Sequence, residues 1–154
     1  PVCFIATAEA SDEEMRFRID RHRTERPADW RTIEEPRHLD IALQQASEAK
    51  IVIVDCLTLC VSNWLLAGED YETTEQNIDG LMDRMTTVMN AGRQTIIMVS
   101  NEVGLGLVPD NVLGRSFRDL LGRVNQHMAQ AASHVYLMVA GLPLELKPNT
   151  RSTQ

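Results

Sequence analysis

Asp55 is the acidic residue with the clearest setting for chemistry. It follows the run Ile51 to Val54, four β-branched apolar residues without polar alternation, which predicts a strand buried on both faces. Ligands of open α/β sheets bind at the carboxyl ends of the strands. A carboxylate there could hold Mg²⁺, directly or through water, beside a phosphorylated ligand. The alternative is that Asp55 caps a helix expected from Leu57 to Leu66.

His22 is the candidate nucleophile. It lies near the end of an arginine-rich segment, between Arg21 and Arg23. A neutral imidazole can attack phosphorus, and the ordinary histidine pKa of about 6.5 leaves much of this form at pH 7. The neighbouring guanidiniums could bind phosphate oxygens in forked pairs. The alternative is a core histidine, because Met15 and Ile19 share its expected helix face.

Two further polar groups follow or accompany apolar runs. Asn101 and Glu102 follow the run 95–99 and could bind a ligand hydroxyl or polarise a group near the metal. They could equally tie down their own glycine-containing loop. The segments 117–119 and 122–126 could line a cleft or meet another subunit, although a surface Arg–Asp pair on an ordinary helix explains them as well.

Alternating strands and helices must position these candidates. Ser11 and Glu14 form a capping box, which predicts a helix to about Arg23, and Thr73 or Thr74 could cap a long helix that ends at Gly92. Other helices are expected to begin near residues 36, 57 and 111, and strands are expected at 1–8, 30–33, 51–54, 94–100 and 134–140. The pattern predicts one α/β domain over residues 1–154, with a mainly parallel sheet, helices on both faces and a frayed polar tail at 149–154.

Composition narrows the class of protein. The net charge of −7 argues against a nucleic-acid binder, and no apolar run is long enough for a membrane span. No signal peptide is visible, and the three cysteines lack zinc-ligand spacing, so a reduced cytoplasmic compartment fits. A phosphate ligand remains compatible with the acidic chain, because five arginines fall within eleven residues: Arg16, Arg18, Arg21, Arg23 and Arg26.

Several motifs taken together resemble a known family, the bifunctional adenosylcobinamide kinase/adenosylcobinamide-phosphate guanylyltransferases of cobalamin assembly. They run in the family's order along nearly the whole chain. The matching residues are Phe4 to Thr7, Asp12 to Met15, Arg18-Ile19 leading to His22, Arg26-Pro27, Trp30 to Thr32 with Glu34, Ser100 to Gly104 with Gly106, Val108-Pro109, Phe117 to Asp119, and Gly122 to Gln126.

The resemblance implies a P-loop NTPase (RecA-like) sheet and two reactions. A kinase step phosphorylates the aminopropanol hydroxyl of adenosylcobinamide with ATP or GTP. A transferase step moves GMP from GTP onto that phosphate through a guanylylated histidine, whose position is that of His22. The resemblance also suggests a homotrimer with sites near subunit boundaries. The family's nucleotide contacts fall on Ala6, Thr7, Ala8, Arg23, Thr24, Glu25, Arg26, Glu34 and Asp55, with Mg²⁺ at Asp55.

Two features depart from the family pattern. The family often has Glu where this chain has Asp55, which is one methylene shorter. The family also opens with a strand and a glycine-rich loop ending in Gly-Lys-Ser, and no such motif occurs in residues 1–154. We therefore expect a front segment with that strand and loop to be missing before Pro1. The alternative is a non-catalytic α/β nucleotide-binding or oligomer-forming protein.

Overall fold

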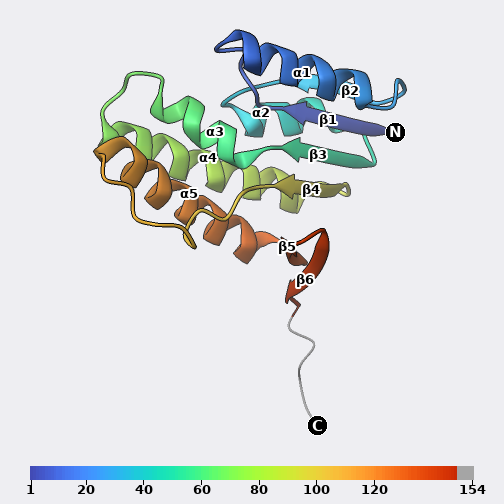
Figure 1. Cartoon of the computed structure of the whole chain (residues 1–154). Coiled ribbons are helices and arrows are strands. Elements are labelled where there is room, and N and C mark those ends of the chain that lie inside the picture. The colour runs from blue at the N-terminus through green and yellow to red at the C-terminus, as the bar shows by residue number, and fades with distance from the viewer. Residues whose placement is uncertain (149–154) are drawn as a thin grey trace.

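Four parallel strands form the central sheet of the computed structural model, in the order β2-β1-β3-β4 (Figure 1). The structure describes residues 1–148, so the expected frayed tail lies outside the described residues. The strands are β1 (Val2–Ala6), β2 (Arg31–Glu34), β3 (Ile51–Asp55) and β4 (Thr95–Val99). The predicted α/β class with a mainly parallel sheet is confirmed.

Five helices alternate with these strands, as predicted. They are α1 (Glu13–Glu25), α2 (Leu39–Gln45), α3 (Leu57–Leu65), α4 (Tyr71–Ala91) and α5 (Val112–Ala131). Within the described residues, none of them is both long and apolar enough to cross a membrane.

The two faces of the sheet differ in burial. Cys3, Ile5, Val52 and Val54 are fully buried against a core built from α2, α3, α4 and α5. Residues that alternate with them face the other side, where Ile51 keeps 37% of its surface exposed. The prediction that this strand is buried on both faces is therefore wrong. The end of α1 lies over this second face, where Arg26 contacts Phe4 of β1 and Arg23 pairs with Glu34 of β2.

Aspartates cap the first and the longest of the helices. The carboxylate of Asp12, not Ser11, accepts from the Met15 amide at 2.7 Å. Asp70 likewise accepts from the Thr73 amide at 2.9 Å, whereas Thr74 is buried. Both expected caps are wrong, because the aspartate directly before each helix satisfies the free amides of its first turn.

An antiparallel hairpin follows α5 and was only half predicted. Its strands are β5 (Val135–Val139) and β6 (Leu142–Lys147). Ala140 and Gly141 both have positive φ, 51° and 78°, which gives the tight turn that short hairpins require. The sequence pattern predicts the strand at 134–140 and none at 142–147. The Ala-Gly pair and the alternating leucines that follow it were the available signal.

Candidate functional site

The carboxyl ends of three strands place two carboxylates on one face of the sheet. Ala6 of β1 is in register with Glu34 of β2 on one side and with Asp55 of β3 on the other. Paired residues of parallel strands share a face, so Glu34 and Asp55 flank Ala6 two strand spacings apart, about 10 Å. Two carboxylates from separate segments of the chain therefore meet at this edge of the sheet.

The end of α1 lays two arginines over the same face. Arg23 forms a hydrogen-bonded ion pair with Glu34. The Arg26 guanidinium lies 3.8 Å from the centroid of the Phe4 ring, and its Nη1 donates to Thr32 Oγ1 at 3.2 Å. Burial lowers the pKa of Arg26, and the nearby Asp55 carboxylate opposes this shift. The two guanidiniums and two carboxylates thus form one charged group at the sheet edge.

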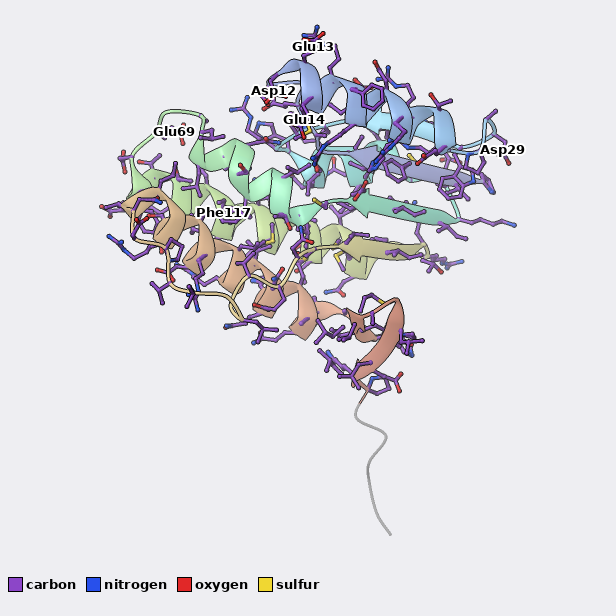
Figure 2. All side chains as sticks on the ribbon, in the orientation of Figure 1. Asp12, Glu13, Glu14, Asp29, Glu69 and Phe117 are labelled. Carbon is purple, nitrogen blue, oxygen red and sulfur yellow. The ribbon has the colours of Figure 1, made fainter. Side chains whose placement is uncertain are left out.

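His22 is exposed, in the last turn of α1. The alternative of a core histidine is wrong, since α1 buries none of its residues and even Met15 and Ile19 are only half-buried. Figure 2 shows the acidic side chains Asp12 and Glu13 at the opposite, N-terminal end of this helix. His22 therefore belongs to the basic end, next to Arg23.

The remaining predicted contacts on α1 have partners inside the helix. Thr24 Oγ1 donates to the Asp20 carbonyl at 2.7 Å, and Glu25 lies 3.9 Å from the Arg21 guanidinium. Both side chains are exposed. They do not join the group formed by Arg23 and Arg26 at the sheet edge.

Thr7 binds β1 to the end of β3. Its side chain is fully buried, and its hydroxyl donates to the Cys56 carbonyl at 2.9 Å and accepts from the Cys56 amide at 2.7 Å. Its own amide donates to the Asp55 carbonyl at 3.0 Å. Thr7 thereby fixes the backbone that carries Asp55. Ala8, the next predicted contact, is half-buried where the chain leaves this clamp.

Asp55 does not cap α3. The N-cap of that helix is Cys56, which makes no side-chain capping bond, so the capping alternative is wrong. The described residues contain no cluster of three His, Cys, Asp or Glu side chains suited to a metal. Mg²⁺ in nucleotide sites needs only one or two carboxylates, because phosphate oxygens and water complete its shell. The half-buried Asp55 carboxylate fits that limited role.

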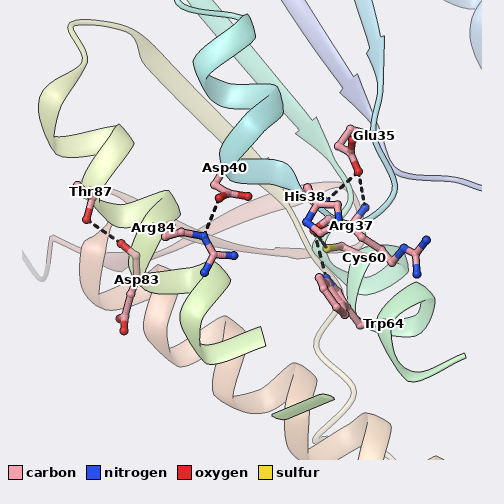
Figure 3. Close-up of polar contacts among 9 residues, drawn as sticks. All are labelled: Glu35, Arg37, His38, Asp40, Cys60, Trp64, Asp83, Arg84 and Thr87. Carbon is pink, nitrogen blue, oxygen red and sulfur yellow. Dashed lines mark hydrogen bonds and ion pairs between the residues drawn. The ribbon is translucent and has the colours of Figure 1, made fainter. Parts of the chain in front are cut away.

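Sequence reasoning missed the side chains of α3 that hold the loop after Glu34. Asn63 Nδ2 donates to the carbonyls of Thr7, at 2.8 Å, and Pro36, at 3.0 Å. Trp64 Nε1 donates to the Arg37 carbonyl at 3.1 Å (Figure 3). An apolar helix pattern gives no hint of these bonds, since their acceptors are backbone groups distant in sequence.

Asn101 and Glu102 secure the loop after β4. The amide and Nδ2 of Asn101 both donate to Thr58 Oγ1, at 2.9 and 3.1 Å. Glu102 accepts from the Gly104 amide, and Arg118 Nη2 donates to the Gly104 carbonyl at 2.9 Å. The loop-holding alternative therefore describes these side chains, and Arg118 of α5 holds the same loop.

A parallel α/β sheet with arginines over carboxylates at its carboxyl edge defines a class of protein suited to phosphorylated ligands. Comparison with known families makes the class specific. The family described as "Cobinamide kinase / cobinamide phosphate guanyltransferase" matches residues 1–146. The chain belongs to this family, which confirms the resemblance found in the sequence.

Relatives from three bacteria match over most of their length. The bifunctional adenosylcobalamin biosynthesis protein CobU of Escherichia coli is 37% identical, over 95% of this chain and 86% of the relative. CobU of Salmonella typhimurium is 39% identical with the same coverage. CobP of Pseudomonas aeruginosa is 43% identical, over 95% of this chain and 82% of the relative.

Proposed function

We propose that this protein phosphorylates adenosylcobinamide with ATP or GTP and then transfers GMP from GTP to the resulting phosphate. The observation that carries the proposal is the group Arg23, Arg26, Glu34 and Asp55 at the sheet edge, in a chain of this family. Guanidiniums supply the charge that nucleotide phosphates require, and the two carboxylates supply acceptors for base, ribose or metal.

His22 is the proposed nucleophile of the transferase step. A ring nitrogen attacks the α-phosphorus of GTP while the bond to pyrophosphate breaks, and pyrophosphate leaves. An oxygen of the cobinamide phosphate then attacks the same phosphorus, and the imidazole leaves with its electron pair. Two transfers at one phosphorus thus replace a single difficult one. The exposure of His22 beside Arg23 supports this role, because the ring is open to a bound nucleotide.

The other site residues bind and orient in this proposal. Arg23 and Arg26 neutralise phosphate oxygens, and Thr7 keeps the Asp55 backbone in place. Mg²⁺, held by Asp55 and the nucleotide, would spread the phosphate charge when bound. The backbone at Ala6 and Ala8 borders the same face.

We also propose that the protein is a homo-oligomer located in the cytoplasm. All three cysteines of the described residues are free, and Cys3 and Cys60 are buried. Free thiols fit a reducing compartment. A trimer rests on the family resemblance alone.

Labelling of the histidine tests the transferase step. The full-length protein is incubated with α-labelled GTP and Mg²⁺, and the protein-bound label is examined for acid lability and alkali stability. We expect stoichiometric labelling of the wild type and no labelling of His22→Ala. His134→Ala is the control and should be labelled like the wild type, because His134 is an exposed histidine just before β5. Labelled His22→Ala would contradict the assignment. GTP binding without labelling of the wild type would favour the non-catalytic alternative.

A further inference from the structure

We infer that the end of α3 and the start of α5, with the loop before α5, form a subsite for the corrin ring of the cobinamide substrate. The inference rests on the proposed function and extends it to a surface that the nucleotide does not use. A pocket of about 330 Å³ lies there. It is lined chiefly by Ser62, Leu65, Leu66, Asn111, Leu113 and Phe117.

The pocket and the loop before α5 carry exposed apolar side chains. Leu107 is 97% exposed, and five neighbours in the chain or the pocket are each more than half exposed: Leu66, Leu105, Val108, Val112 and Leu113. Single exposed leucines are ordinary on a soluble protein, but a gathered set of this size indicates a binding surface.

Polar contacts hold the loop in place, so its apolar side chains are displayed on a fixed backbone. Arg115 Nη1 donates to the carbonyls of Pro109 and Asp110, at 3.1 and 2.9 Å. Asn111 caps α5 by accepting from the Gly114 amide at 2.7 Å. Gly114 also permits close packing, since a Cβ there would lie 2.7 Å from Pro109 Cβ. Such preorganisation lowers the entropic cost of binding.

The loop before α5 begins beside the sheet edge that carries Asp55. Asn101, where the loop begins, is bonded to Thr58 in the first turn of α3, three residues after Asp55. The pocket lies at the other end of α3, whose nine residues span about 13 Å. Phe117 of α5, which lines the pocket, is labelled in Figure 2 and shows its place between α3 and α5.

The chemistry of the lining excludes the nucleotide and fits the corrin. No charged side chain lines the pocket, so phosphates would find no partner there. A corrin ring offers apolar faces, methyl groups and neutral amide side chains, which the leucines, Phe117, Ser62 and Asn111 could meet. Its reacting hydroxyl lies at the end of an aminopropanol side chain. That side chain is about 8 Å long, the length of two to three residues of extended polypeptide. The ring must therefore bind away from the reacting phosphorus, and the pocket lies away from the sheet edge, at the other end of α3.

The hairpin offers a second exposed apolar surface, but its position does not suit the substrate. Tyr136, Met138 and Leu142 are each more than half exposed. They follow the far end of α5, which spans 20 residues, about 30 Å, from the pocket (Figure 1). The hairpin therefore supplies a control surface.

Binding of the coloured substrate tests the inference. The full-length protein is titrated with adenosylcobinamide phosphate, with the visible absorption of the corrin as the signal, and separately with GTP by calorimetry. We expect Leu113→Gln and Leu107→Gln each to weaken corrinoid binding about fivefold or more. GTP affinity and oligomeric state should stay unchanged. Leu107 is so exposed that its replacement should not affect folding, and Leu142→Gln in the hairpin should bind like the wild type.

Three results would overturn the inference. The first is unchanged corrinoid affinity in both Leu113→Gln and Leu107→Gln, and the second is equal weakening by Leu142→Gln. The third is an altered oligomeric state with unaltered corrinoid affinity, which would identify an interface between copies. A wild-type protein that binds no corrinoid would instead refute the proposed function itself.

Discussion

At the scale of single residues, Thr7 shows how one buried hydroxyl can maintain a site. It both donates to and accepts from Cys56. Thr7→Val keeps the shape but leaves both Cys56 groups without their partner, and we expect the free energy of unfolding to fall by about 2 kcal/mol. Thr7→Ser keeps the hydroxyl and should lose less. Urea unfolding measures both, and a Thr7→Val variant as stable as the wild type would show that the hydroxyl does not matter.

Glu34 should affect the ligand more than the fold. Its ion pair with Arg23 is largely exposed, and such pairs add at most about 1 kcal/mol to stability. If Glu34 contacts the nucleotide, Glu34→Gln should weaken GTP binding about tenfold with little change in melting temperature. Glu14→Gln breaks a comparable exposed ion pair, that of Glu14 with Arg18 on α1, and should leave GTP binding unchanged. Calorimetry compares the two, and equal effects would remove Glu34 from the site.

At the scale of elements, α1 is held by its ends rather than by a core. It buries no residue, so its capping bond at Asp12 should govern its local stability. Asp12→Ala should lose about 1 kcal/mol there, with amide hydrogen exchange in α1 speeding up and global unfolding nearly unchanged. Asp12→Asn keeps a capping oxygen and should exchange like the wild type. A matching loss in global stability would mean that α1 unfolds only with the core.

α2 and α4 are joined by an ion pair with one buried partner. Arg84 Nε donates to Asp40 Oδ2 at 2.7 Å, and Asp40 is almost fully buried whereas Arg84 is half exposed (Figure 3). Arg84→Met leaves a buried carboxylate unpaired and should cost about 2 kcal/mol, less than for a fully buried pair. Adding Asp40→Asn to Arg84→Met should restore much of the lost stability, because the buried group is then uncharged. Chemical denaturation of the single and double variants measures the coupling, and purely additive losses would exclude it.

At the scale of the whole molecule, the sequence predicts the order and type of elements better than their packing. The apolar run of β3 looks the same whether one face or two are buried. Only the packing of the helices on the sheet leaves Ile51 partly exposed, and no local pattern encodes that packing. Hairpin strand β6 escaped prediction because its turn residues were not matched to the alternation after them.

The candidate site was predictable in part for the same reason. Asp55 and the arginines stand out locally, from a strand end and a charge cluster. That Glu34 lies on their face depends on β1 lying between β2 and β3, which no local pattern encodes. The resemblance to a family supplied Glu34, and the bonds of Asn63 needed the three-dimensional structure.

Cys60 should make the whole fold sensitive to alkali. Its thiol is buried against the Arg37 carbonyl, 3.6 Å away, and burial raises its pKa to about 12. The unfolded thiol ionises at about 8.5, so above that pH the unfolded state loses a proton that the folded state keeps. Stability is full below about pH 8.5 and should fall between there and pH 12, by up to about 1.4 kcal/mol per pH unit.

The slope of stability against pH isolates this thiol from other alkaline effects. Cys60→Ala should be less stable at pH 7, because it removes a buried group, yet its stability should decline less steeply above pH 9. Denaturation across this pH range compares it with Cys56→Ala, whose half-buried thiol provides the matched control. Parallel curves for Cys60→Ala and the wild type would show that other groups cause the alkaline loss. A shallower slope for Cys60→Ala alone would assign the alkaline loss to the thiol beneath the Arg37 carbonyl.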